Sequence, residues 1–336
     1  MAFSSQSGQV AFREQSEKGT PATDIETNGI AMRITSGGLA GERELLVPDA
    51  EIGGGRDVQG GLLGTISFAG DFEYYVRMNA LATQLKAVLG VAVSAPGGED
   101  GVFEHTITPS DGAIPFYTIY ERISNGLLVS NYIDCAANTF SLEVEPNGQM
   151  TATTGWIGAR NEFDVPELDV DDIYDNGPMV AGTNVTVSYA GVEIAAKSFS
   201  TEINNNIEDD DFRLGSFFLH DMTPKQREVT NSMTIRHEDA VLLRQALFGS
   251  ATASSVSCAT DESPIVVTAN TCEVIGETAL TYQLELEYPN CIVEPFAFEP
   301  SGDDVIENDV TFRAVRPDLG TPIMTARIRN SIETIA

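Results

Sequence analysis

Residues 62–90 read LLGTISFAGDFEYYVRMNALATQLKAVLG, and this stretch decides which fold the rest of the chain is expected to adopt. Apolar residues alternate with small polar ones over 64–68, which predicts a strand. Asp71 stands where it can cap a helix over 73–89, and Gly90 stands where a left-handed residue ends one. Steps of three and four residues give this helix one apolar face. Its members are Tyr74, Met78, Leu81, Leu85 and Val88.

The same order of features returns later in the chain. Residues 232–236 alternate like a strand, Glu238 and Asp239 open a shorter leucine-bearing helix, and Gly249 closes it. Further on, strand-like runs ending in Glu-Pro-Asn-Gly at 145–148 and Glu-Pro-Ser-Gly at 299–302 also correspond. The spacing of roughly 155–160 residues is close to the ~150-residue size of one domain. We therefore predict two copies of one unit, with chance resemblance between β-rich segments as the alternative.

Changes in composition suggest the boundaries between these units. Residues 1–28 are polar and aperiodic, which predicts an extended arm that is disordered or docks on a neighbouring subunit. The first unit is expected at 29–160, an acidic and solvated linker at 161–182, and the second unit at 183–336. Strand patterns outnumber helix patterns, so the expected class is mostly β (α+β), with antiparallel strands and one flanking helix per unit. Edge strands of such sheets can pair with another chain.

Several finer features are predicted along the chain. Asn125-Gly126 signals a hairpin between two short strands, and 323–335 is expected to form a last strand or a second docking arm. The Gly-rich segment 49–63 and the acidic segment 204–211 are expected to be loops in matching places of the two units. Residues 250–270 are also expected to form a loop.

The charge of the chain excludes some functions. Fifty acidic residues against 19 basic ones give 336 residues a formal net charge of −31. Such a surface repels nucleic-acid phosphates, which excludes an ordinary DNA-binding protein but allows a surface past which DNA slides. A saline habitat is an alternative cause of this acidity. The first residues lack the features of a signal peptide, and no apolar run has membrane-spanning length, so a soluble, cytosolic product without membrane contact is expected.

The sequence lacks the residue patterns of catalytic and metal sites. The three histidines lie outside any nucleophile or zinc motif, and the four cysteines have no CxxC spacing. Cys258 and Cys272 are expected to stay thiols, or to pair if the protein meets oxidant. The acidic run 169–175 lacks the spacing of an EF-hand calcium loop. We predict no enzyme activity, no cofactor and no metal.

Several segments together resemble the major tail tube proteins of long-tailed, siphovirus-like bacteriophages. They are the N-terminal residues 4–12 and 17–21, the Gly-rich run 51–57 before a strand, and the stretch 140–159. The resemblance implies β-sandwich or barrel units that form rings, usually hexameric, stacked into a hollow tube. Two tube units per chain imply a trimeric ring with pseudo-sixfold symmetry, although a hexamer stays open.

The resemblance also implies a set of partners and a place in the virion. The chain would contact other copies of itself, the tape measure protein, and the tail terminator and tail tip proteins of a long non-contractile tail. Assembly would occur in the host cytoplasm, and DNA would pass during ejection without specific binding. The candidate inter-ring or inter-subunit contacts are Phe3, Phe12, Gly54, Arg56, Asn205 and Asp210. The alternative function is a cell-surface, adhesin-like tandem β-domain protein stabilised by calcium.

Overall fold

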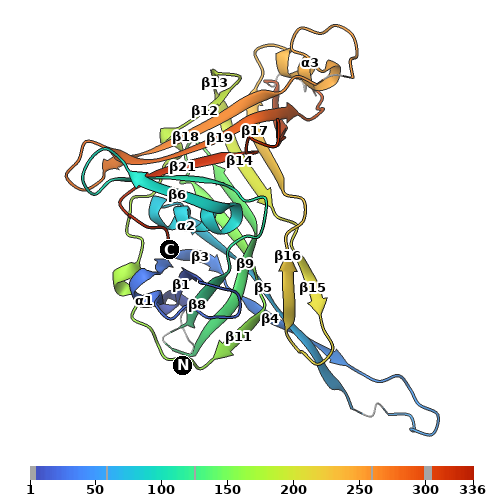
Figure 1. Ribbon diagram of the computed structural model, residues 1–336. Helices are drawn as coiled ribbons and strands as arrows, with labels where there is room; N and C mark the ends of the chain where they lie inside the picture. The colour runs from blue at the N-terminus through green and yellow to red at the C-terminus, as the bar shows by residue number, and fades with distance from the viewer. Residues whose placement is uncertain (1–4, 58–59, 125, 259, 299–304) are drawn as a thin grey trace.

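The computed structural model describes residues 5–57, 60–124, 126–258, 260–298 and 305–336. Strands dominate it, and all the pairings between named strands are antiparallel, which confirms the predicted mostly-β class. Figure 1 shows the sheets crossing the molecule, with α2 near the middle, α3 at one end and the β4–β5 hairpin projecting from the other.

The elements of the first half have the following bounds. The strands are β1 (Gln9–Glu14), β2 (Ile30–Met32), β3 (Ile34–Gly37), β4 (Ala40–Leu46), β5 (Leu62–Tyr75), β6 (Gly90–Pro96), β7 (Phe103–Pro109), β8 (Tyr117–Ile123), β9 (Leu128–Val144), β10 (Thr151–Gly158) and β11 (Arg160–Phe163). The helices are η1 (Ser5–Ser7), α1 (Ile25–Asn28), α2 (Met78–Leu89) and η2 (Asp171–Ile173).

The second half contains the remaining elements. The strands are β12 (Val185–Tyr189), β13 (Val192–Ile194), β14 (Ala196–Asn204), β15 (Glu208–Phe212), β16 (Leu219–Thr223), β17 (Glu228–Arg236), β18 (Ser263–Val274), β19 (Thr281–Val293), β20 (Glu307–Ala314) and β21 (Thr325–Asn330). The helices are η3 (Gly182–Asn184) and α3 (Val241–Phe248).

One sheet joins both halves of the chain. Its strands follow the order β4, β5, β10, β9, β14, β17, β20 and β19, with β3 pairing with β5 beside β4. On one edge β19 pairs with β18, which pairs with β12, and on the other with β21, which pairs with β7. A continuous apolar core underlies both halves, because buried residues from Val10 to Ala336 belong to one cluster.

Strand β9 belongs to two sheets because its backbone bends. Its first part pairs with β8 and β11, and its second part pairs with β10 and β14. At the bend the register with β8 shifts and Asp134 has a φ of 57°. Asp134 is held there by the N-terminal segment: its Oδ1 accepts bonds from the Gln15 side chain (2.9 Å) and the Gly19 amide (2.6 Å).

The N-terminal residues differ from the predicted arm. From Gln9 onward they form β1, which pairs with β2 and β8 of the same chain. Phe12 is fully buried, with its ring centroid 5.4 Å from that of Phe72 and 5.5 Å from that of Trp156. Its apolar residues thus anchor the segment in the chain's own core.

The boundary between β5 and α2 also differs from the prediction. The strand continues to Tyr75, and the helix begins at Met78 rather than at Glu73. The reason is that Phe68, Phe72 and Tyr74 keep a two-residue spacing of buried positions, so Tyr74 is buried from a strand. The predicted helix face is otherwise confirmed, because Met78, Leu81, Leu85 and Val88 are all buried.

Other expectations are corrected by long-range packing. The short strand expected after Asn125-Gly126 and the strand-like run expected before 145–148 are one strand, β9. Part of the loop predicted at 250–270 is strand β18. Asn125 of the expected hairpin turn lies outside the described residues, as do 299–302. Residues 323–335 contain a last strand, β21, which was the first of the two alternatives predicted for this segment.

The acidic segment 161–182 packs along the first half of the chain. It begins within β11, and its Val170 and Val180 are fully buried. The side chain of Asp175 is buried as well, with Oδ2 accepting a hydrogen bond of 2.7 Å from the Ala80 amide at the start of α2. The segment therefore has buried anchor residues that its composition did not reveal.

Candidate assembly surfaces

One side of the main sheet ends in an exposed edge formed by β3 and β4. All seven residues of β4 are exposed, and among the described residues this strand pairs with β5 only. Unpaired backbone groups on such an edge can bond to a strand of another chain.

A strand in the corresponding place of the second half, β14, is paired on both edges. In the first half, β3 and β4 pair with β5, which is the strand before α2. In the second half, β14 pairs with β17, which is the strand before α3. The other edge of β14 pairs with β9, from Phe199 opposite Val144 to Asn204 opposite Thr139. This β9–β14 junction joins the two halves edge to edge.

Where β19 ends, beyond its pairing with β18, residues 293–298 lie along β20. The Glu294 amide donates to the Thr311 carbonyl at 2.8 Å, and the Asn308 side chain donates to the Ala297 carbonyl at 3.0 Å. The rings of Phe296 and Phe298 lie 5.4 Å and 4.7 Å from the ring of His237. Burial lowers the pKa of His237. These contacts hold the segment beside β20 although residues 294–298 are not in a strand.

Most of β15 falls in the segment 204–211 that was predicted as a loop, and the hairpin that β15 forms with β16 docks on the first half. Leu219 and Met222 of the hairpin and the preceding Ile207 are buried, whereas Leu214 and Phe217 near its tip are exposed. The residues of the first half in the same cluster are Ile114, Ala136, Ile157 and Ala159. The Ile66 amide of β5 donates to the Phe217 carbonyl at 2.9 Å. Apolar burial thus fixes this hairpin against its own chain.

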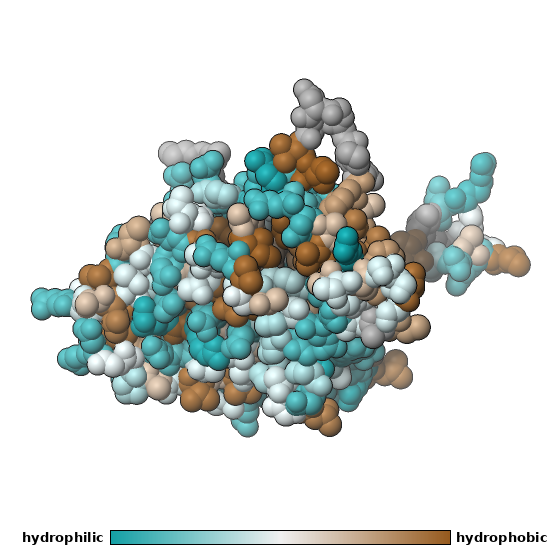
Figure 2. Space-filling view, turned by 90° about the horizontal axis from the view of Figure 1, so that it is seen from above, coloured by the Kyte–Doolittle hydropathy of each residue, from teal (hydrophilic) through white to brown (hydrophobic). Residues whose placement is uncertain are grey.

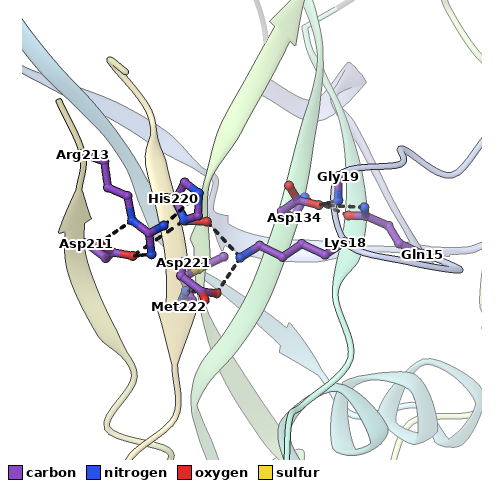
Figure 3. Close-up of polar contacts among 9 residues, drawn as sticks. All are labelled: Gln15, Lys18, Gly19, Asp134, Asp211, Arg213, His220, Asp221 and Met222. Atoms are coloured by element: carbon purple, nitrogen blue, oxygen red, sulfur yellow. Dashed lines mark hydrogen bonds and ion pairs between the residues drawn. The ribbon is translucent and has the colours of Figure 1, made fainter. Parts of the chain in front are cut away.

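Polar contacts fasten the same hairpin to the N-terminal segment (Figure 3). Lys18 donates to the Asp221 carboxylate at 2.5 Å and to the His220 carbonyl at 2.9 Å. The bond from Lys18 lowers the pKa of Asp221. On the other strand of the hairpin, Arg213 pairs with Asp211 at 2.8 Å.

The β4–β5 hairpin, by contrast, projects into solvent (Figure 1). Apolar side chains flank its Gly-rich tip and are exposed: Leu45 (58%), Leu46 (47%), Leu62 (75%) and Leu63 (55%). A cluster of exposed leucines on a projecting element is typical of a protein interaction site. Sequence reasoning selected the Gly-rich tip and overlooked these leucine pairs, although their position on both flanks of a polar loop was visible in the sequence.

An open cleft lies at the base of the β15–β16 hairpin, between residues of both halves. Its volume is ≈ 780 Å³, and its walls come from residues 108–112, the start of β17 with residues 224–227, and residues 313–323. Four of its residues are basic: Lys225, Arg227, Arg313 and Arg316. Burial lowers the pKa of Arg227, which donates to Asn205 Oδ1 at 2.8 Å. The face of the molecule in Figure 2 shows hydrophilic and hydrophobic residues interspersed.

The six contact candidates lie in different surroundings. Phe3 is outside the described residues, and Phe12 is buried in the core. Asn205 is also buried, with its side-chain amide donating to the carbonyls of Val88 (2.9 Å) and Ala137 (3.0 Å). The other three are near the hairpins: Gly54 is half-buried and Arg56 exposed in the tip of β4–β5, and Asp210 is exposed on β15. The structure does not bring the six together.

The side chains considered for metal binding or pairing are separate. Over the described ranges, no three His, Cys, Asp or Glu side chains gather as a metal site would require. All four cysteines are free thiols; Cys135 and Cys291 are buried, and Cys258 and Cys272 are exposed. None of the described helices has the length and apolar character needed to cross a bilayer.

Comparison with known proteins identifies the family. A search of the curated proteins found no match. A family model described as phage tail tube protein matches residues 5–314, which include both hairpins and reach the end of β20 in the second half. The chain therefore belongs to the phage tail tube protein family, a family of structural proteins of the virion tail.

Proposed function

We propose that this chain is a tail tube subunit whose two halves are related units, and that three chains close into a ring. Stacked rings form a hollow conduit for DNA in a long non-contractile tail. Support for two units comes from the order of elements: β3–β4, β5 and α2 are followed by β10 beside β5, and β14, β17 and α3 are followed by β20 beside β17.

The β9–β14 junction is the observation that carries the proposal. In this junction the second half of the chain extends the sheet of the first half by edge-to-edge pairing. In the second unit, residues 293–298 stand beside β20 as the end of β9 stands beside β10. The exposed β3–β4 edge of another chain would then pair with 293–298, as β14 pairs with β9. Repetition of the same contact closes a ring.

The charge of the chain suits a DNA conduit. A net charge of −31 makes the average surface repel phosphates, so DNA can pass without binding. We extend the proposal to the partners that a tail tube requires: further rings, the tape measure protein, the terminator and the tail tip. Assembly would take place in the host cytoplasm.

Electron microscopy of the purified chain tests the proposal. We expect rings or tubes whose axial view has threefold symmetry with six similar lobes. Proline removes a backbone donor, and adjacent amides of a strand point to opposite edges. Arg43 lies opposite Ile66, whose amide bonds to Phe217 instead of to β4, so the Arg43 amide points to the free edge and the Glu42 amide points to β5. Glu42→Pro should therefore break the pairing with β5 and lower the melting temperature. Arg43→Pro should leave that temperature nearly unchanged and prevent ring closure. A chain that stays monomeric at high concentration would refute the proposal.

A further inference from the structure

We infer that the β4–β5 hairpin of one chain fills the open cleft at the base of the β15–β16 hairpin of a neighbouring chain. The inference rests on the proposed ring, but it concerns a second contact, separate from the pairing of sheet edges. It assigns a partner to an exposed apolar element and an occupant to a cleft.

The two hairpins occupy corresponding places in the chain. The β4–β5 hairpin joins the edge strand of the first half to the strand before α2. The segment that contains β15 and β16 joins β14 to the strand before α3. The β15–β16 hairpin rests on the other half of its own chain, whereas the leucines beside the tip of the β4–β5 hairpin stay exposed.

Apolar residues stand at matching positions of the two hairpins. Ile207 follows three residues after the end of β14, and Leu45 lies near the end of β4; Met222 and Leu62 lie where the chain returns toward the next long strand. Ile207 and Met222 are buried at 8% and 5% exposure, whereas Leu45 and Leu62 are 58% and 75% exposed. The difference is that the first pair has another unit to contact.

The docking surface also has a counterpart. The β15–β16 hairpin contacts the first half at Ile66 of β5 and at Ile157 and Ala159, at the end of β10. In the second half, β17 and β20 take the places of β5 and β10, and the start of β17 and the end of β20 are walls of the cleft. The cleft is therefore found where a neighbour's hairpin would lie.

Charge supports the same occupant. The cleft is lined by four basic side chains and by the acidic Asp111 and Glu228. The segment 40–64 carries five acidic residues and two basic ones. The acidic residues are Glu42, Glu44, Asp49, Glu51 and Asp57. Lys225, Arg313 and Arg316 already pair with Glu208, Glu294 and Asp111 of the same chain. The lining still has more basic than acidic residues in a chain with 50 acidic and 19 basic ones, and this favours an acidic segment of a second copy.

Disulfide trapping tests the contact. In a background with Cys258→Ser and Cys272→Ser, Leu45→Cys is combined with Val315→Cys, or with Leu319→Cys in case Val315→Cys impairs folding. Assembled rings exposed to mild oxidant should give covalent dimers and trimers on a non-reducing gel, and either single variant should give no trimer. A control pairs Leu45→Cys with Val256→Cys, an exposed site in the loop after α3.

The outcomes separate this inference from the proposed function. Rings without cross-links in both variant pairs would overturn the inference and leave the ring intact, as would equal cross-linking in the control. Absence of rings in the parent chain would overturn the proposed function itself. As a second measurement, Leu45→Asp with Leu63→Asp should raise the protein concentration at half-assembly ~10-fold or more. Unchanged assembly of a folded double variant would contradict the inference.

Discussion

The helices α2 and α3 have similar local signals but very different surroundings. Each follows a long strand and ends at a glycine with positive φ, Gly90 or Gly249. Ten of the 12 residues of α2 are buried, because it lies against strands of both halves, β7, β9 and β21 among them. Of the eight residues of α3 only Gln245 is buried. The sequence thus specifies both helices locally, and a neighbouring unit decides how deeply each is buried.

The largest expected effect is a loss of core packing in α2. Leu85→Ala removes a fully buried side chain and should lower the free energy of unfolding by ~2–5 kcal/mol. Leu247 in α3 is the counterpart and is 46% exposed, so Leu247→Ala should change the free energy of unfolding of the monomer by only ~0.5 kcal/mol. Urea denaturation of the two variants measures the difference. Similar losses would show that α3 is as well packed as α2 and would remove the contrast.

Much of this contrast was predictable, and the missing part has a physical cause. The glycine terminators and the leucine face of α2 are local features, so the sequence predicted them. The start of α2 was misplaced because Tyr74 lies four residues before Met78, as on a helix face, and two residues after Phe72, as on a strand face. The position of Phe12 depends on pairing with β8, more than 100 residues away, which no local pattern encodes. For the candidate contact surfaces, the Gly-rich tip was visible, but the cleft depends on three distant segments.

A smaller effect is expected from the carboxylates that bind the two helix starts. Asp175 is buried and reaches α2 from a distant segment of the chain. Its Oδ1 accepts a hydrogen bond of 2.8 Å from the Gly177 amide, and its Oδ2 accepts one from the Ala80 amide. Asp239 lies two residues before the start of α3 and is exposed, and its Oδ1 accepts a hydrogen bond of 2.9 Å from the Val241 amide. Asp175→Ala leaves buried amides unpaired and should cost ~1–3 kcal/mol of unfolding free energy. Asp239→Ala should cost ~0.5–1 kcal/mol, as loss of a surface cap does. If the two variants lost the same unfolding free energy in the same denaturation assay, burial of the helix start would not determine the cost of removing its carboxylate.

The smallest effect concerns the pH dependence of stability in the two halves. Burial raises the pKa of Glu121, on β8, to about 7, although bonding to the Leu39 backbone and Tyr132 lowers it. The folded state therefore favours the neutral carboxyl. Its stabilising contribution is complete below the unfolded pKa, near 4.5, and is lost as pH rises through about 7. Glu121→Gln stays neutral, so at pH 8 it should melt about 2–4 °C above the parent chain, and at pH 5 the difference should shrink.

Glu307, in the second half, provides the matched control because its pKa is shifted in the other direction. Hydrogen bonds from Lys197 and Arg236 lower the pKa of this exposed carboxylate. Its contribution is present above the unfolded pKa and lost as pH falls through the folded one, so Glu307→Gln should lower the melting temperature at pH 8 rather than raise it. Melting curves from pH 4 to pH 8 distinguish the two variants. If both variants shifted the melting temperature in the same direction at pH 8, Glu121 in the first half and Glu307 in the second would not differ in the charge state that the fold favours. The contrast between the two halves would then be limited to apolar packing.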